Sequence, residues 1–185
     1  MKGIKDHLTP AFYHAWNALF NPLYTYYIFK GGRNSGKSTF VSRCIILLMM
    51  KFPVNALVVR KVANTLSESV YEQLIDSIES LGVNDYWKRS KSPLGLMYIP
   101  RGNRIIFRGA DDPVKLKSIK SHKFPIAILW IEEVSEFKNE DEVSTIVNSV
   151  IRAELPEGLK YYIFYSYNPP RALNSWVNVK YNTSL

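Results

Sequence analysis

Gly31-Gly32-Arg33-Asn34-Ser35-Gly36-Lys37-Ser38 is the stretch that decides the fold. It matches the pattern G-x-x-x-x-G-K-[ST] in full, between a predicted strand over 24–30 and a predicted helix over 37–50, which is the context that this motif requires. Its glycines let backbone N–H groups turn inward around phosphate oxygens, and the helix N-terminus adds partial positive charge. A chance glycine-rich turn rarely combines a full match with this context. The stretch therefore predicts a binding site for a nucleoside triphosphate.

The side chains of this loop have distinct expected roles. Lys37 can reach the β and γ phosphates, and the Ser38 hydroxyl can ligate Mg²⁺. Arg33 could meet the γ phosphate and sense its loss, or it could be a solvated side chain at the loop crest, and the sequence leaves both readings open. The predicted nucleotide-binding residues are Gly31, Gly32, Arg33, Asn34, Ser35, Gly36, Lys37, Ser38 and Thr39.

Apolar strands and helices alternate along the rest of the chain. We expect helices over 9–20, 37–50, 66–81 and 140–152, strands over 24–30, 56–60, 126–131 and 160–166, and a hairpin of 97–100 with 104–108. Continuous apolar strands separated by helices indicate a parallel sheet covered on both faces. The expected fold class is α/β, a mostly parallel twisted sheet flanked by helices, of the P-loop NTPase type (ASCE or RecA-like). In such sheets ligands bind beyond the carboxyl ends of the strands.

Two acids follow the apolar strand that is predicted over 126–131. This is the form of a Walker B segment, in which Glu132 would support Mg²⁺ and Glu133 would act as the base for the attacking water. Many P-loop proteins have aspartate at the first position, and glutamate is one methylene longer. A buried strand that merely reaches solvent at two charges is the alternative. The complete phosphate loop upstream favours the catalytic reading, and two adjacent carboxylates favour hydrolysis over passive binding.

The aromatic strand predicted over 160–166 continues into Tyr167-Asn168-Pro169-Pro170. A polar side chain at this strand end, Ser166 or Asn168, can bond the attacking water or the γ phosphate and couple hydrolysis to movement. The two prolines hold the exit of the strand rigid. An ordinary turn is the alternative, because Asn-Pro is common in turns.

Composition narrows the class of protein. The chain has 185 residues, enough for one well-buried core, and 24 basic against 16 acidic residues give a net charge of +8, which suits a polyanionic partner. The single cysteine, Cys44, lies in an apolar run and excludes a disulfide framework. The N-terminus lacks an apolar signal core, and no apolar run is long enough to span a bilayer.

Together these segments resemble the ATPase domain of phage terminase large subunits, in particular the PBSX-like group with a G-x-x-x-S-G-K-S loop, an apolar strand that ends in I-E-E, and an S-x-N-P-P segment. The resemblance covers roughly residues 25–178 and is supported by three further stretches: 58–70, 107–118 and 133–137. It implies an ATP hydrolase that uses Mg²⁺ to drive double-stranded DNA into a procapsid, with Lys37, Arg33 and Glu133 as catalytic residues. It places the metal at Ser38 and Glu132, and the coupling function at Ser166 and Asn168.

The resemblance also implies partners and a location. The implied partners are the portal protein, the terminase small subunit and further copies of the chain in a ring, although an isolated domain could be a monomer. The implied location is the host cell cytoplasm. We expect residues 1–185 to form a single ATPase domain. The RNase H-like nuclease domain of the family would be absent, so no DNA cutting is expected from this chain.

Two other functions stay open. One is another P-loop enzyme, such as a helicase-like translocase or a small-molecule kinase, and the other is a nucleotide-dependent DNA-binding or assembly module with little turnover.

Several residue roles are also left unassigned. Weak adenine candidates are Phe12, Tyr13 and Trp16; arginines that could act on a neighbouring subunit are Arg60, Arg101, Arg104, Arg108 and Arg152; residues that could face DNA are Lys115, Lys117, Lys120, His122 and Lys123.

Overall fold

One seven-stranded mixed sheet forms the centre of the molecule. The computed structural model describes residues 4–111, 119, 123–152 and 154–181. The strand order is β1-β7-β6-β2-β5-β4-β3, with every pair from β1 to β5 parallel and the last two pairs antiparallel. The strands are β1 Tyr26–Lys30, β2 Asn55–Arg60, β3 Trp87–Lys91, β4 Leu94–Tyr98, β5 Asn103–Gly109, β6 Ile126–Glu132 and β7 Tyr162–Tyr167.

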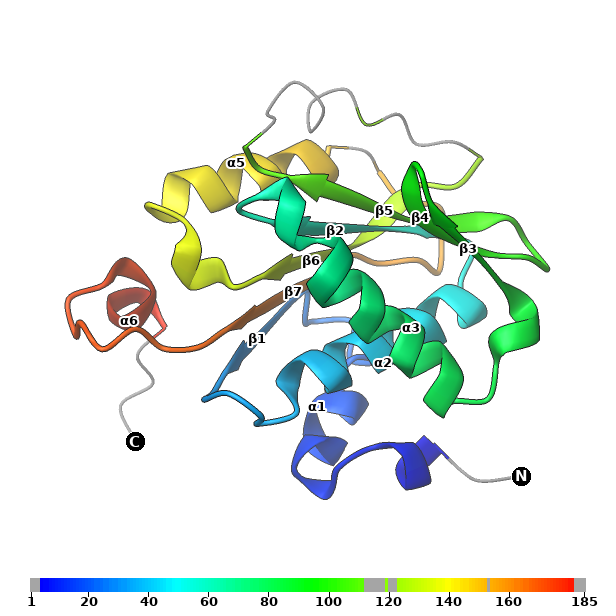
Figure 1. Cartoon of the computed structure of the whole chain (residues 1–185), viewed down its shortest axis with the longest axis horizontal. Coiled ribbons are helices and arrows are strands. Elements are labelled where there is room, and N and C mark those ends of the chain that lie inside the picture. The colour runs from blue at the N-terminus through cyan, green and yellow to red at the C-terminus, as the bar shows by residue number, and fades with distance from the viewer. Residues whose placement is uncertain (1–3, 112–118, 120–122, 153, 182–185) are drawn as a thin grey trace.

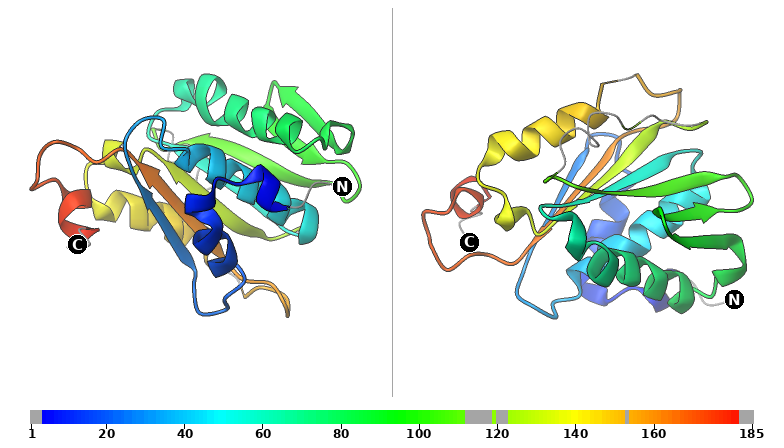
Figure 2. Two further views of the ribbon diagram at one scale, coloured as in Figure 1. Left: turned by 90° about the horizontal axis from the view of Figure 1, so that it is seen from below. Right: turned by 45° about the horizontal axis from the view of Figure 1, so that its top comes forward.

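Helices cover both faces of this sheet (Figure 1). The α-helices are α1 Tyr13–Ala18, α2 Lys37–Lys51, α3 Glu72–Ser80, α5 Glu140–Val150 and α6 Trp176–Lys180, and a π-helical turn, Ser67–Tyr71, precedes α3. Figure 2 shows α1, α2 and α3 on one side of the sheet and α5 on the other. Two buried apolar clusters result, one between the sheet and α2 with α3, the other between the sheet and α5.

The central parallel strands β2, β6 and β7 are buried on both faces, whereas β1 at the edge is partly exposed. Every residue of β7 is buried, and so are the five residues Asn55–Val59 of β2 and the five residues 127–131 of β6. Strands with both faces covered show continuous apolar runs, which is the pattern that their sequences have. Cys44 is fully buried in α2, as its apolar neighbours indicated. The expected α/β fold with a mostly parallel sheet and flanking helices is confirmed.

The remaining differences from the expected elements have local causes. Strand β3 was not expected, because its segment Trp87-Lys88-Arg89-Ser90-Lys91 is mostly charged; it lies at the sheet edge and pairs only with β4. Helix α6 was not expected either, because it is only five residues long. The helix expected over 66–81 begins with the π-helical turn and becomes α-helical at Glu72.

Polar side chains fix one end of helix α5 and one end of helix α2. Asn139 caps α5, because its side chain accepts a hydrogen bond from the Glu142 amide at 3.1 Å, and three acids in the first turn complement the helix dipole. At the far end of α2, Arg101 donates to the carbonyls of Met49, Met50 and Phe52. These contacts hold α2 against the sheet, so that its N-terminus has a fixed position at the phosphate loop.

The strand order brings three loops to one edge of the sheet. β7 lies between β1 and β6, and all three strands are parallel, so their carboxyl ends meet. The phosphate loop follows β1, the acid pair ends β6, and Asn168 follows β7. β2 adds Arg60 to the same edge, since β2 pairs with β6. In the part of the chain that the structure describes, no helix is long and apolar enough to cross a membrane.

Candidate nucleotide site

The phosphate loop curls tightly between β1 and α2. Gly36 has φ +78°, a left-handed conformation that favours glycine, and a Cβ built on Gly31 would lie 2.9 Å from the Ser35 Oγ. The Gly31 amide donates to the Tyr167 carbonyl at 3.3 Å and so ties the start of the loop to the end of β7. The left-handed backbone therefore favours glycine at position 36, and a side chain at position 31 would have to displace that of Ser35.

Lys37 is the first residue of α2, and 7% of its surface is exposed. Its ammonium group donates to the Gly32 carbonyl at 3.2 Å and to Asn168 Oδ1 at 2.8 Å. The first contact lies within the loop, and the second crosses to the end of β7. The lysine head is thus held over the loop by two neutral oxygens and not by a carboxylate.

Glu133 turns away from the strand that it follows. Its backbone has φ +54° and ψ +55°, which is left-handed and unusual for a residue with a side chain. The turn brings the carboxylate to Asn168, whose Nδ2 donates to Oε1 at 2.5 Å and whose backbone amide donates to Oε2 at 3.3 Å. A continuous chain of hydrogen bonds therefore runs from Glu133 through one amide group to Lys37.

Glu132 lies in a different environment, although it is the adjacent residue. Its side chain is 12% exposed, and its Oε2 lies 2.7 Å from Nε of Arg60. Burial raises the pKa of Glu132 to about 7, against the opposing effect of the Arg60 charge, and the neighbouring carboxylates of Glu133 and Glu136 add to the increase. The arginine at the end of β2 is the nearest cation to this carboxylate, and Lys37 has a weaker effect on it.

Ser166 does not join the chain of Lys37, Asn168 and Glu133. Its hydroxyl accepts a hydrogen bond from Trp130 Nε1 at 2.9 Å, and both residues are buried. Trp130 is fully buried in β6, so this bond satisfies an indole N–H that would otherwise lack a partner in the core. Of the two residues expected to couple hydrolysis to motion, the structure brings only Asn168 to the lysine and the acid.

The other side chains of the loop lie at its crest and in the first turn of α2. Ser38 and Thr39 follow Lys37 in the first turn of α2 and are partly buried, while Arg33 and Asn34 are exposed at the crest. Metal ligands need not come from the protein alone, because Mg²⁺ keeps waters and binds nucleotide phosphates besides one or two protein oxygens. The described part of the chain has no group of three or more acids, histidines or cysteines that could hold a metal ion by itself. A hydroxyl at Ser38 and a buried carboxylate at Glu132 fit a magnesium nucleotide.

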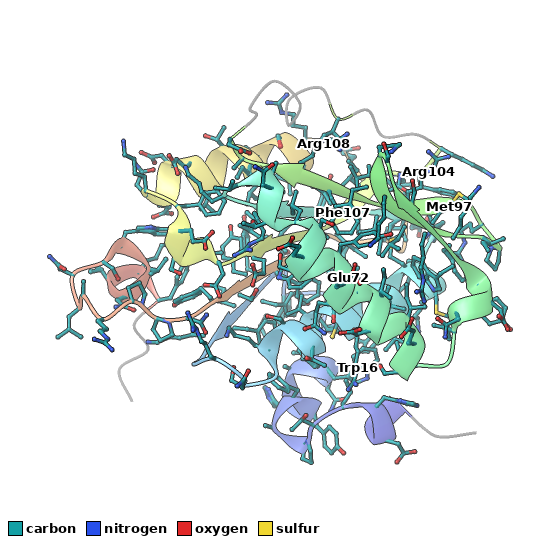
Figure 3. All side chains as sticks on the ribbon, in the orientation of Figure 1. Trp16, Glu72, Met97, Arg104, Phe107 and Arg108 are labelled. Atoms are coloured by element: carbon teal, nitrogen blue, oxygen red, sulfur yellow. The ribbon has the colours of Figure 1, made fainter. Side chains whose placement is uncertain are left out.

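Aromatic packing explains the positions of two of the three adenine candidates, Phe12 and Trp16. The Phe12 ring stacks on Phe40 with centroids 4.6 Å apart, and one of its carbons would lie 3.5 Å from a Cβ on Gly36. Trp16, which Figure 3 shows on the N-terminal helical segment, packs edge-on against Phe20. Phe12 supports the phosphate loop from behind, whereas Trp16 belongs to the packing of α1.

The candidate arginines are distributed over the whole sheet. Arg60 is engaged with Glu132, and Arg101 is engaged with the end of α2. Arg104 and Arg108 lie on β5, toward opposite ends of that strand (Figure 3), and Arg152 is exposed just beyond α5. Among the candidates for DNA contact, Lys123 is exposed and lies over the Phe124 ring. The other four, Lys115, Lys117, Lys120 and His122, lie outside the described residues.

A separate hollow of about 570 Å³ lies away from the phosphate loop, over the face of β3, β4 and β5 that α3 does not cover. In the described part of the chain its lining is apolar with three cations and no acid: Lys88, Ser90, Pro93, Leu94, Gly95, Leu96, Met97, Arg104, Ile105, Ile106, Arg108 and Ile119. On the opposite face of the same β3 strand, Arg89 and Lys91 pair with Glu79 and Glu72 of α3. The two faces of this strand therefore differ in how their cations are neutralised.

Comparison with known proteins gives one consistent family. The model of the family described as "Phage terminase large subunit" matches residues 24–184. The terminase large subunit of Bacillus phage SPP1 is 54% identical over 181 residues, which is 98% of this chain and 43% of that protein. The PBSX phage terminase large subunit of Bacillus subtilis (strain 168) is 38% identical over 127 residues, covering 69% of this chain and 28% of that protein.

Solved structures show the same fold. The large terminase of the thermophilic bacteriophage D6E superposes with a TM-score of 0.63 at 18% identity, over 85% of this chain and 37% of that chain. This chain therefore spans less than half the length of each of these large subunits from SPP1, PBSX and D6E.

Proposed function

Because the chain belongs to the phage terminase large subunit family, we propose that it is the ATP-hydrolysing motor domain that drives double-stranded DNA into a procapsid. The observation that carries the proposal is the hydrogen-bond chain from Glu133 through Asn168 to Lys37. It connects a carboxylate suited to act as a base with the lysine of a phosphate loop. The D6E large terminase, which shares the fold, has been solved in complex with ADP and with ATP-gamma-S.

We propose these roles for the residues of the site. Backbone N–H groups of 31–38 and the Lys37 ammonium hold the phosphates, and Arg33 reaches the γ phosphate from the loop crest. Ser38 and Glu132 would hold Mg²⁺, which supplies charge neutralisation on the phosphates when it is bound. Glu133 takes the proton of the water whose oxygen attacks the γ phosphorus, while the bond from that phosphorus to the β–γ bridging oxygen breaks and leaves ADP.

Asn168 would report the state of the phosphate. Its amide oxygen accepts from Lys37 and its amide nitrogen donates to Glu133, so it contacts both the residue that binds phosphate and the base. A γ phosphate that draws the Lys37 ammonium toward itself competes with Asn168 for that donor. The change then reaches Pro169 and the segment beyond it, which makes Asn168 our choice for coupling ATP turnover to movement.

Hydrolysis itself is tested by Mg²⁺-dependent phosphate release, with and without duplex DNA. We expect ATP turnover that duplex DNA stimulates and that Lys37→Ala abolishes by weakening nucleotide binding. Stimulation by a small-molecule acceptor would favour a kinase. Tight ATP binding with no release of phosphate, in the presence of DNA and of the other packaging proteins, would favour the nucleotide-dependent assembly module.

The DNA partner is supported by charge. The net charge of +8 favours binding to a polyanion, and the residues described as lining the hollow over β3–β5 include cations and no acids. Replacing Lys88 and Arg104 by glutamine should lower the salt dependence of duplex binding, by a slope of about 0.9 for each lost phosphate contact. The matched control is Arg89 with Lys91, on the opposite face of β3 and paired with acids. An unchanged slope in the first variant would remove this face from the DNA path.

Family membership also supports the wider setting that we propose. The domain would act in the host cell cytoplasm, as a subunit of a ring, with the portal protein and the terminase small subunit as partners. Arg104, Arg108 and Arg152 are the candidates that we retain for an arginine acting on a neighbouring subunit. Arg60 and Arg101 each contact several groups of their own chain, whereas Arg108 and Arg152 donate to backbone carbonyls close to them in sequence. The molar mass of the protein in solution, measured with nucleotide and duplex DNA present, tests whether it assembles into a ring.

A further inference from the structure

Arg60 occupies a position that the family motifs leave without a function. It is the last residue of β2, and β2 pairs with β6 in a register that sets Val59 beside Ile131. The side chains of Arg60 and Glu132 therefore leave neighbouring strands at the same edge of the sheet. Each side chain is 12% exposed, so this is a largely buried pair of opposite charges next to the phosphate loop.

Three separate groups contact the guanidinium. Its Nε forms an ion pair with Glu132 Oε2 at 2.7 Å, and Nη2 lies 3.2 Å from Oε1 of Glu136, in the turn that follows the acid pair. On the other side, Nη1 donates to the Ser69 hydroxyl at 3.3 Å, within the π-helical turn Ser67–Tyr71. The planar fork of arginine can meet three partners at once, which a lysine ammonium on a single flexible stem cannot do in the same geometry.

We propose that Arg60 is the positioning residue of the nucleotide site: it holds the Glu132 carboxylate at the end of β6 and ties it to the π-helical turn, so that loading the site with magnesium nucleotide changes this turn. The inference rests on the proposed function, because Glu132 matters here as the metal-supporting acid. Arg60 itself is not expected to touch the nucleotide. It acts through Glu132.

The charge balance of this corner supports the positioning role. Glu132, Glu133 and Glu136 place three carboxylates within five residues, and Arg60 contacts two of them. Removal of Arg60 would take away the cation that contacts the largely buried Glu132 carboxylate, and the side chain would no longer be held in this position. Partners that hold a metal-ligating carboxylate commonly affect metal affinity or activity by about 10- to 100-fold when they are removed.

The π-helical turn is the segment that Arg60 contacts through Ser69. The Tyr71 amide bonds the Leu66 carbonyl at 3.1 Å, the wide spacing that defines a π turn, and Ser69 Oγ also donates to the Thr65 carbonyl. Such turns are uncommon and are found frequently at functional sites. Because the turn continues directly into α3, a shift of Arg60 would be transmitted along that helix to the face that packs on α2.

The first test is the Mg²⁺ concentration needed for half-maximal binding of a fluorescent, non-hydrolysable ATP analogue. We expect Arg60→Gln to raise this concentration roughly tenfold or more, while binding of the analogue without metal changes little. Arg60→Lys keeps one cation beside Glu132 and should recover part of the Mg²⁺ response. The matched control is Lys61→Gln, which removes the adjacent cation and its 2.7 Å ion pair with Glu142 but leaves Glu132 paired.

The second test is amide hydrogen exchange over residues 67–71. If Arg60 had a purely structural role, adding metal would not change the exchange rates in this turn. In the parent protein, adding Mg²⁺ to the analogue complex should change exchange in this turn. Both Arg60→Gln and Arg60→Lys should lose that response, since neither can bridge Glu132 and Ser69, whereas Lys61→Gln should keep it. If Arg60→Gln does not fold, the lysine variant decides the question by the same measurement.

The outcomes separate the two proposals. If the parent protein binds no magnesium nucleotide, the proposed function fails and the inference fails with it. If the parent protein binds it normally and Arg60→Gln shows the parent Mg²⁺ dependence, only the inference is wrong. Loss of the Mg²⁺ response in Lys61→Gln to the same degree would likewise overturn it, because the effect would then follow the number of cations and not the contact with Glu132.

Discussion

Glu132 and Glu133 are neighbours in sequence and yet belong to two different parts of the site. The first continues the strand and points to a cation on β2, 2.7 Å away, in a largely buried position. The second follows a left-handed turn and points to a neutral amide on the loop after β7, 2.5 Å away. The two adjacent carboxylates therefore have different partners, one on β2 and the other on the loop after β7.

The difference shows how two identical side chains can take two tasks. The carboxylate of Glu132 is engaged by the guanidinium of Arg60 at 2.7 Å, so its position is fixed from β2. A carboxylate held by an amide keeps lone pairs that can accept a proton, and the amide connects it to Lys37. The environments of the two acids therefore support the assignment of Glu132 to the metal and Glu133 to the base.

The largest effect is expected when Glu133, the second carboxylate, can no longer accept a proton. Glu133→Gln keeps the shape of the side chain and one acceptor for the two N–H donors of Asn168, but it cannot accept a proton. We expect ATP hydrolysis to fall by roughly a hundredfold or more, the magnitude of a lost general base, with ATP affinity nearly unchanged. Single-turnover phosphate release together with equilibrium nucleotide binding measures both. Hydrolysis at the parent rate would transfer the role of base to another group.

A smaller effect is expected when the amide between base and lysine is removed. Asn168→Ala cuts both hydrogen bonds of the chain, and misplacement of a catalytic group typically lowers the rate by roughly 10- to 100-fold. The control is Asn178→Ala, which removes a side-chain amide that donates to the Pro170 and Ala172 carbonyls. We expect kcat to fall in the first variant alone. Equal losses in both would show that the whole segment after β7, and not this amide, supports turnover.

The sequence allowed the loops of this site to be predicted better than their contacts. A complete motif fixed the phosphate loop, and apolar strands ending in polar residues placed Glu133 and Asn168 at one edge of a parallel sheet. The left-handed turn at Glu133 has no sequence signal, since glycine is absent there, and the pairing of Arg60 with Glu132 depends on the order of strands in space. The partner of Ser166, Trp130, also comes from a neighbouring strand, 36 residues away in sequence.

The first carboxylate can be tested through the pH dependence of stability in the metal-free protein. Burial raises the pKa of Glu132 from its usual 4.5 to about 7, so the protonated form favours the folded state. The stability that it contributes is fully present below pH 4.5 and is lost as the pH rises through 7, by at most on the order of 3 kcal/mol.

Glu132→Gln lacks this titration and provides the reference. The free energy of unfolding of the parent protein, minus that of the variant, should therefore decrease between pH 4.5 and 7 and stay constant above that range. Denaturant unfolding in EDTA at a series of pH values measures both curves. Parallel curves would mean that the guanidinium of Arg60 offsets the burial of Glu132 completely.

The smallest effect on catalysis is expected at Ser166, and it distinguishes the two residues first considered for coupling. Ser166→Ala leaves the buried Trp130 indole N–H without an acceptor, which costs about 1 to 3 kcal/mol of stability. It breaks no contact of Lys37, Glu133 or Asn168, so the rate of ATP turnover and its stimulation by duplex DNA should stay at the parent values below the unfolding temperature. Loss of the DNA stimulation at unchanged stability would move the coupling function from Asn168 into the strand itself. Asn168 follows the end of β7 and is partly exposed, whereas Ser166 is buried within the strand. The amide can therefore follow a phosphate with less disturbance of the core than the hydroxyl, which argues for the first arrangement.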